Sequence, residues 1–345
     1  MLIIFCFLCI IMILTLRIHF KGIDRMYLSK DNTQVIKGVF IIIVFLSHIK
    51  GYADFFSQGD IFVKKILTYL GQLMVAYFLF TSGYGVLESI KKKGREYVLN
   101  MPKNRIGKTF FDFSLAIILF LILDLIIGKS YSGSTIILAF TGWTSIGNSN
   151  WYMFAIFTLY IITYICFLVF ERNIGMSIIA TSILALIYIY ILSGVKDNWW
   201  SDTYLCYVGG MWFSYYKNKI DYVFEKVGIC GWSIAMLLCT AGYIYISAYR
   251  NERIMAHNIV AVWFCVVIVL FSMKVSFKSR ILRWCGENLF WLYILQRLPM
   301  IFLQHYGINI INSYLYLGLC LIGTVVLTLV MNKVTNILLQ KTWWT

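Results

Sequence analysis

Long apolar runs alternate with short polar and basic stretches along almost the whole chain. The first run extends from Leu2 to Leu16 without a charged residue. Continuous runs approaching 20 residues are typical of transmembrane helices, whereas an outer-membrane barrel shows short segments of alternating polarity. The pattern therefore predicts an all-α polytopic membrane protein.

The apolar runs predict about eleven transmembrane helices. The first run lacks the basic start and cleavage site of a secretory signal, so it is expected to be a retained helix. Residues 133–148 are too short and too rich in Gly, Ser and Thr to span, and are expected in an outer loop, lying on the surface or re-entrant. Gly209-Gly210 predicts close packing or a break. The expected spans are 2–16, 35–50, 66–88, 109–127, 150–170, 176–194, 202–216, 229–247, 258–273, 286–304 and 314–332.

The composition supports this class and orients it. Of 345 residues, 61% are hydrophobic and 13% charged, against about half and a quarter in soluble domains. The net charge is +15. The loops on one side of the predicted spans, with the C-terminal end, hold 22 of the 30 Lys and Arg residues. By the positive-inside rule this predicts the N-terminus outside and the C-terminus in the cytoplasm.

Several partners are not expected. No basic segment is interleaved with aromatic residues at an exposed surface, which argues against nucleic acid. The nine cysteines are scattered and lie mostly inside apolar runs, as small buried hydrophobes do. No His/Cys cluster has zinc spacing, so neither a metal nor a permanently bound cofactor is predicted. No loop is long enough for a separate soluble domain.

The stretch from Lys37 to His48 is an almost unbroken apolar run between a cation and an imidazole. In a helix, eleven residues place His48 roughly 16 Å beyond Lys37 along the axis. His48 then lies past the midplane of a bilayer entered at Lys37. An ionisable group at that depth favours a functional site. The alternative is a histidine at the helix end that faces interfacial water.

Two further segments have both a functional and a structural interpretation. Ser82-Gly83, inside an aromatic run, allows close backbone approach or a local break, but is also typical of ordinary helix packing. Arg105 and Lys108 lie one turn apart at the start of the next helix. Cations at this spacing share a face and can clamp a phosphate-bearing ligand. The alternative is topology charge that meets anionic lipid.

The remaining candidates are intramembrane carboxylates and aromatic helix ends. Asp112 and Asp124 lie within one predicted helix, and either could orient an imidazole. Trp151-Tyr152 opens a helix at the outer face, which suits an aromatic belt or a sugar at a cavity mouth. Tyr293 and Gln296 lie one turn apart near the end of the chain.

Taken in order, these motifs resemble the membrane-bound acyltransferase family 3, the polysaccharide O-acyltransferases. The resemblance covers roughly residues 33–330, and its specificity lies in the order and spacing of the motifs. The matching segments are Lys37 with His48, Phe80-Thr81-Ser82-Gly83-Tyr84, Arg105 with Lys108, Trp151-Tyr152, and Tyr293-Ile294-Leu295-Gln296.

The chain departs from that family pattern at several positions. Lys37 and Lys108 are lysines where arginine is commoner, which loosens a bidentate contact. Gln296 stands where histidine is frequent. The acidic residue often found after the Trp-Tyr segment is absent, and the helix Leu2 to Leu16 lies outside the usual core.

The resemblance implies a core of about ten helices. Residues 1–32 are therefore interpreted as an extra N-terminal transmembrane helix and cytoplasmic loop, and 33–345 as the integral-membrane acyltransferase domain. The implied reaction moves an acyl group, expected to be acetyl, from cytoplasmic acyl-CoA to a sugar hydroxyl of a cell-surface or lipid-linked polysaccharide. Acyl-CoA is then a donor substrate and the glycan is the acceptor.

The resemblance also implies roles for individual residues. His48 is expected to act as general base, or to carry the acyl group itself. The residues expected to bind the CoA phosphates are Lys37, Arg105 and Lys108. The residues expected to contact the substrate are Ser82, Trp151, Tyr152, Tyr293 and Gln296.

The expected location is a bacterial cytoplasmic membrane, with the lipid bilayer as a partner and no prediction of oligomeric state. Two other functions fit a chain with many spans. One is a glycan polymerase or flippase of the same envelope pathway, although no outer loop is as large as a polymerase usually shows. The other is a secondary transporter, although no internal repeat is evident.

Overall fold

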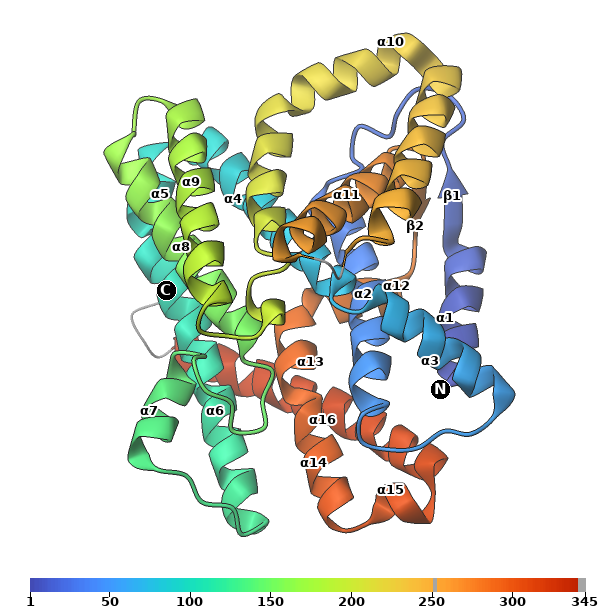
Figure 1. Ribbon diagram of the computed structural model, residues 1–345, viewed down its shortest axis with the longest axis vertical. Helices are drawn as coiled ribbons and strands as arrows, with labels where there is room; N and C mark the ends of the chain where they lie inside the picture. Colours follow the sequence, from blue (N-terminus) through green and yellow to red (C-terminus); the bar gives the residue numbers. More distant parts are fainter. Residues whose placement is uncertain (251–252, 341–345) are drawn as a thin grey trace.

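The computed structural model describes residues 1–250 and 253–340. Lys341, one of the cations expected on the cytoplasmic side, lies outside the described residues. In Figure 1, helices α2 and α13 lie in the middle, between a group formed by α5, α6, α8 and α9 and the edge formed by α1 and β1. The first helices are α1 (Leu2–Thr15), α2 (Lys30–Ile49), α3 (Gln58–Leu70), α4 (Leu73–Lys93), α5 (Arg95–Met101), α6 (Lys108–Ile126), α7 (Gly133–Phe140), α8 (Trp151–Val169) and α9 (Ile174–Ser193).

The second half of the chain contains the longest helix and a series of short ones. Two three-residue strands, β1 (Leu16–Ile18) and β2 (Val275–Phe277), pair antiparallel. The remaining helices are α10 (Leu205–Ser247), α11 (Ile254–Ser272), α12 (Arg280–Glu287), α13 (Leu289–Leu295), α14 (Arg297–His305), α15 (Ile308–Ile311) and α16 (Ser313–Gln340).

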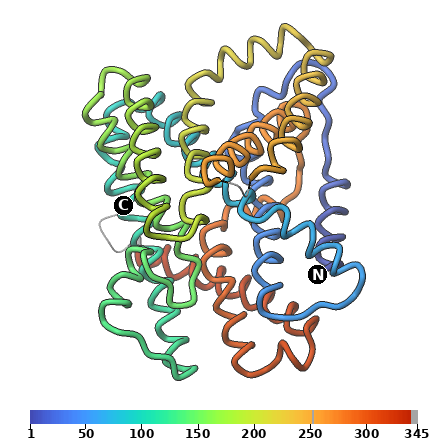
Figure 2. Tube along the Cα trace, viewed as in Figure 1, coloured from blue at the N-terminus to red at the C-terminus, as the bar shows by residue number. Residues whose placement is uncertain are grey.

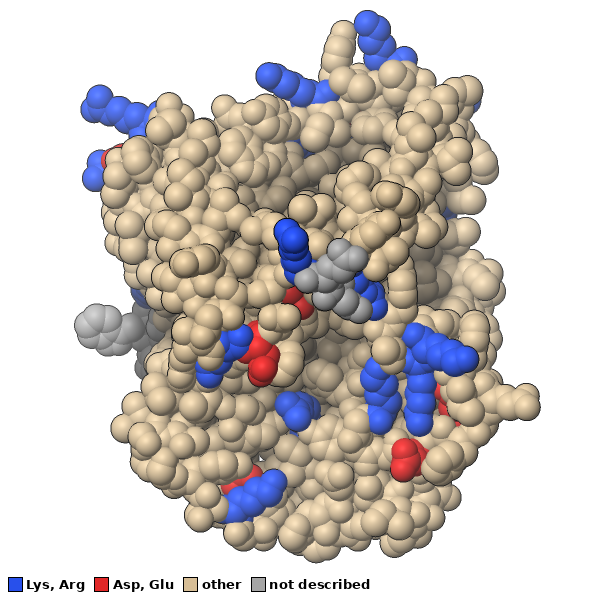
Figure 3. All heavy atoms as spheres, viewed as in Figure 1, with Lys and Arg blue, Asp and Glu red and all other residues tan. Residues whose placement is uncertain are grey.

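The surface and the helix lengths confirm the predicted class. Eight helical segments within the described residues are long and apolar enough to cross a membrane. Many large apolar side chains on them face outward, such as Leu125, Tyr190 and Leu237. Figure 3 shows broad areas that carry neither cations nor carboxylates. The chain is an all-α polytopic membrane protein with one small two-stranded ribbon.

One expected span, 66–88, has the wrong boundaries. Residues 58–70 form a separate helix, α3, capped by the Ser57 side chain, which accepts a hydrogen bond from the Asp60 backbone N–H. Gly71 then adopts a φ of 48°, a conformation that glycine tolerates and that ends the helix. The span proper is α4. A hydropathy pattern that continues across both helices conceals this turn.

Two expected spans, 202–216 and 229–247, belong to one bent helix. Within α10 the only non-helical backbone is at Gly228, which has a φ of 64° and a ψ of −156°. In Figure 2 the trace of α10 rises, turns at the top of the view and descends. The bend therefore lies at Gly228. The glycine pair Gly209-Gly210 lies earlier in the same helix. It does not break the helix but allows close packing.

The segments 133–148 and 286–304 are irregular. The first contains only the eight-residue helix α7, so it does not span, as expected. The second is divided between the short helices α12, α13 and α14, with Asn288 and Gln296 between them. Asn288 departs from helical geometry, with a φ of −101° and a ψ of 20°, whereas Gln296 keeps it, with a φ of −58° and a ψ of −27°. This interruption adjoins the candidate site.

Two helix pairs make backbone-to-backbone contact at glycines. A Cβ atom built on Gly38 of α2 would lie 1.8 Å from the carbonyl oxygen of Leu282 in α12, and one on Gly286 the same distance from that of Gln34. A Cβ on Gly83 of α4 would lie 1.9 Å from the carbonyl oxygen of Tyr207 in α10. Small residues permit this approach, which drives helix association in lipid. The close-packing interpretation of Ser82-Gly83 is thereby confirmed.

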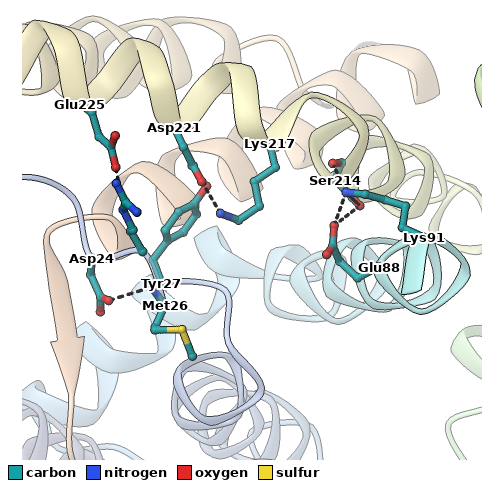
Figure 4. A network of polar contacts seen from close by, with 10 residues as sticks. Asp24, Met26, Tyr27, Glu88, Lys91, Ser214, Lys217, Asp221 and Glu225 are labelled. Carbon is teal, nitrogen blue, oxygen red and sulfur yellow. Dashed lines mark hydrogen bonds and ion pairs between the residues drawn. The ribbon is translucent and has the colours of Figure 1, made fainter. Parts of the chain in front are cut away.

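Polar contacts join the loop between β1 and α2 to helix α10. Figure 4 shows the buried Tyr27 pointing toward Asp221 of α10, to which its hydroxyl donates at 2.7 Å. Nearby, Arg25 pairs with Glu225 at 2.9 Å. Beside them, Glu88 of α4 accepts from Lys91 and from Ser214, each at 2.6 Å. These contacts tie the loop before α2 to α10, and α10 to α4.

The other end of α1 is fixed by a buried carboxylate. Asp60 pairs with the Met1 amino group at 3.0 Å and accepts hydrogen bonds from Tyr314, from Ser57 and from the Leu2 backbone N–H, each at 2.7 Å. Burial alone would raise the pKa of Asp60, but these hydrogen bonds lower it below its ordinary value. Asp60 thus holds α1, α3 and α16 together.

We predict that Gly83→Ala destabilises the protein by about 1–3 kcal/mol, because the new methyl group forces α4 and α10 apart. Thermal unfolding of the detergent-solubilised protein measures this. Gly85→Ala is the matched control, since a Cβ there meets nothing within 4 Å. Equal unfolding temperatures for both variants would contradict the prediction.

Candidate active site

Helix α2 carries the central pair of ionisable residues. Ser29 caps the helix, its side chain accepting from the Asn32 backbone N–H. Eleven residues make about three helical turns, so Lys37 and His48 lie on the same face, roughly 16 Å apart along the axis. The glycine contacts of α2 with α12 occupy another face. The helix therefore presents both side chains toward the same side of the bundle.

His48 faces aromatic and basic neighbours. Its ring keeps accessible surface although protein surrounds it, as for a side chain that faces an internal space. Its centroid is 6.4 Å from that of Tyr293 in α13, and Nδ1 has no hydrogen-bond partner within the described chain. The charged neighbour that acts on it is Arg297, at the start of α14.

Neither candidate aspartate orients the imidazole. Among the residues that the structure describes, no carboxylate hydrogen-bonds to His48. Asp112 interacts with Lys108, and Asp124 with Lys129. Each aspartate keeps one buried carboxylate oxygen without a partner. A carboxylate–imidazole pair at His48 is therefore not part of this geometry.

A cavity of about 140 Å³ lies beside Tyr293. Four elements that are distant in sequence form it, namely α4, α6, α8 and the segment containing α13. Three tyrosines and a threonine give it polar groups on an otherwise apolar wall. Its lining residues are Phe78, Thr109, Tyr152, Met153, Ile156, Tyr160, Leu289, Phe290 and Tyr293.

Tyrosine contacts link this cavity to two predicted site residues. The ring centroids of Tyr152 and Tyr293 are 5.3 Å apart, and Tyr293 in turn faces His48. On the opposite wall, the hydroxyl groups of Ser82 and Tyr160 are 2.9 Å apart. The structure thus brings Tyr152 and Tyr293 together around one space, with His48 beside Tyr293 and Ser82 behind the lining residue Tyr160.

Two cations without carboxylate partners face this region from the end of α2 opposite His48. Lys37 is enclosed by protein, and the nearest charge acting on it is Arg105. Arg105 donates from Nε to the Tyr97 hydroxyl at 2.8 Å. Within residues 1–250 and 253–340, no ion pair to a carboxylate involves either side chain. Two like charges near one another at a buried position require a compensating anion.

Three other predicted residues lie at the margin of this arrangement. Lys108 is exposed, because residues 102–107 form a π-helical turn that directs it away from the partly buried Arg105. Trp151 is half-buried and contacts Tyr152, its ring centroid 6.1 Å away. Gln296 is fully buried and donates from Nε2 to the Tyr293 carbonyl at 2.9 Å. Its Oε1 has no partner in the described chain.

Sequence analysis missed some residues that the structure places here. Tyr160 lies four residues after Ile156 and eight after Tyr152, so the helical period was a usable signal for it. Sequence analysis assigns Arg297 no role at the site and counts it only among the cations of the outer side and helix ends. It donates from Nε to the Tyr52 hydroxyl at 2.8 Å and lies near His48. No local pattern links Tyr52 to Arg297, because 245 residues separate them.

The described part of the chain contains no group of three or more His, Cys, Asp or Glu side chains that could hold a metal ion. What the site offers is an imidazole, tyrosine hydroxyls and unpaired cations. Such a set can bind an anion and move a proton without further groups.

The fold and the site define an integral membrane protein in which a half-buried imidazole lies beside a tyrosine-lined cavity, with two cations further along the same helix bundle. The family model described as an acyltransferase domain matches residues 31–333. The chain belongs to this family, acyltransferase family 3, and the protein is an acyltransferase. No curated protein and no solved structure matches the chain.

We predict that Tyr160→Phe lowers the rate of acyl transfer several-fold while the protein stays folded, because the Ser82 hydroxyl loses its partner at the cavity wall. Tyr164→Phe, one turn further along α8, is the matched control because Tyr164 does not line the cavity. Initial rates with labelled acetyl-CoA measure the effect. Equal rates for both variants would exclude a role for the Tyr160 hydroxyl.

Proposed function

We propose that this acyltransferase moves an acyl group, acetyl in the first instance, from cytoplasmic acyl-CoA to a sugar hydroxyl of a cell-surface or lipid-linked polysaccharide. His48 is the general base. The observation that carries the proposal is the arrangement on one face of α2. Two cations without carboxylate partners lie at one end, and an imidazole beside a tyrosine-lined cavity lies at the other.

The cations suit the donor. CoA carries several phosphate groups, and Arg105 can form the bidentate contacts that phosphates favour. Lys37 supplies a second point charge close by. An anion between them removes the like-charge repulsion that the free protein retains. Lys108 is exposed at the edge of this basic region. It adds to the positive electrostatic potential there without contacting the CoA phosphates directly.

The topology that this reaction needs places the basic end of α2 in the cytoplasm and His48 toward the outside. Helix α1, the two halves of α10 and the interrupted α12–α14 segment each cross in this scheme, which turns the eight candidate spans into eleven. The N-terminus is then outside and the described C-terminal helix ends in the cytoplasm, with the positive loops inside. The membrane is a bacterial cytoplasmic membrane.

The chemistry at His48 is a proton transfer coupled to acyl transfer. The acceptor oxygen attacks the thioester carbonyl carbon while His48 takes the hydroxyl proton. The carbon–sulfur bond then breaks, and the thiolate of CoA leaves with a proton returned by the imidazolium. The His48 side chain makes no hydrogen bond within the described chain, so no protein group competes for the ring in this exchange. Acyl transfer through the imidazole itself remains the second route.

The family membership argues against the two rival functions. A polymerase, a flippase or a secondary transporter needs no acyl donor and forms no acylated product. Purified protein supplied with labelled acetyl-CoA and host envelope glycan separates these classes. Label in the glycan supports acyl transfer, and glycan movement without label would support the rivals.

We predict that His48→Ala lowers acyl transfer by at least about 100-fold, the usual effect of removing a general base. CoA binding and the unfolding temperature should stay near wild type, because the His48 side chain makes no hydrogen bond in the described chain. Transfer of labelled acetyl to glycan is the measurement. Wild-type transfer by the folded variant would reject His48 as the base.

We predict that Arg105→Ala weakens CoA binding roughly 10-fold or more, since a charge-assisted contact to phosphate is lost. The dependence of binding on salt should also become shallower. Calorimetric titration with CoA at several salt concentrations tests both points. Lys103→Ala, an exposed cation two residues away, is the control. Unchanged binding in Arg105→Ala would leave this arginine a topology charge only.

A further inference from the structure

A second cavity of about 340 Å³ lies beyond the His48 end of α2. It is formed by the loop that follows α2 and by the segment from α15 to the start of α16. Figure 1 shows this loop and α15 in the same part of the molecule, at the bottom of the view. The side chains that give it its chemistry are Lys50, Tyr52, Asp54, Phe56, Asn309 and Ser313.

The groups around this outer pocket match a ligand with many hydroxyl groups. Asp54 is exposed and forms no ion pair within the described residues. Asn309 donates from Nδ2 to the Tyr52 carbonyl at 2.8 Å, while its Oδ1 is buried without a partner. Asn309 thus fixes the Tyr52 backbone at the edge of the pocket, and the exposed Asp54 carboxylate is free to accept a hydrogen bond from a ligand hydroxyl group. Carboxylate, amide and ammonium groups together fix the orientation of such a ligand.

The same pocket offers an aromatic surface. Phe56 is 81% exposed, although its neighbour Phe55 is only 1% exposed. An exposed ring at the edge of a polar pocket can cover the apolar C–H face of a sugar. A lipid chain has no groups that could hydrogen-bond to Asp54 or Asn309, and the negative charge of Asp54 repels a simple anion. The combination therefore favours a saccharide.

The outer pocket is connected to the candidate base. Its wall begins two residues after His48, and the Gly51 backbone N–H donates to the His48 carbonyl at 3.0 Å. The Tyr52 hydroxyl accepts from Arg297 Nε at 2.8 Å, and Arg297 is the charge that acts on the His48 ring. A ligand held here is separated from His48 by Tyr52 and Arg297.

We propose that the outer pocket is the binding site of the saccharide acceptor, with Asp54, Asn309 and Phe56 as its recognition residues. This inference rests on the proposed function, because it assumes a sugar acceptor that arrives at the His48 end of α2. It differs from the sequence-based expectation, in which Trp151 and Tyr152 hold the sugar. Tyr152 instead lines the inner cavity together with Tyr160 and Tyr293.

The test varies the concentration of glycan extracted from the host envelope at saturating labelled acetyl-CoA. Asp54→Asn and Phe56→Ala should each raise the KM for glycan about 10-fold, with kcat within about two-fold of wild type. A carboxylate–hydroxyl contact is worth roughly this factor. Phe62→Ala is the control, because Phe62 is 61% exposed on α3 and does not line the pocket. It should leave the KM unchanged.

Two outcomes would overturn the inference, and they are distinguishable. If wild-type protein acylates the glycan and both variants keep its KM, the acceptor binds elsewhere and the proposed function stands. If wild-type protein binds CoA but transfers no label to glycan, the polysaccharide acceptor is wrong and the saccharide pocket is rejected with it. Binding of CoA to the Asp54→Asn variant, measured separately, should equal that of wild type.

Discussion

The architecture depends on direct contact between helix backbones. In lipid the hydrophobic effect does not hold helices together, so packing at small residues must do so. Gly38 and Gly286 bring α2 onto α12, and Gly83 brings α4 onto α10. The first contact fixes His48 relative to the segment that carries Tyr293. The second fixes Ser82 at the cavity wall. The close backbone contacts between helices therefore determine where the residues of the site lie.

The second constraint concerns two cations whose charge is not neutralised by a carboxylate. Asp60, Asp221 and Glu88 are each matched by hydrogen bonds or cations, and they fasten helices together. Lys37 and Arg105 are the contrast, because no carboxylate of the described chain neutralises them. Inside a membrane such a charge is expensive to keep. In the proposed function the phosphate groups of CoA supply the negative charge that the fold itself does not.

The sequence predicted the class, the short α7 segment and the close packing at Ser82-Gly83, because hydropathy and small residues act locally. It also placed His48 near one end of a long helix, about three turns after Lys37. It missed the turn at Gly71 and the bend at Gly228, since apolar character continues through both. It could not place Arg297 next to Tyr52, or Tyr160 next to Ser82. Those contacts depend on how distant helices pack, which no local pattern encodes.

The length of α2 explains how one site can serve two compartments. A rigid helix separates the cations from the imidazole by roughly 16 Å, which is about half the thickness of the bilayer core. A long, flexible donor can cover that distance, whereas a polar glycan cannot enter it cheaply. In the proposed reaction the chemistry therefore occurs near the His48 end of α2, where the segment from α12 to α14 brings Tyr293 and Arg297 close to His48. An interrupted helical segment is tolerated in a membrane only beside protein or a cavity. In the proposed reaction the segment from α12 to α14 lies where the two substrates would meet.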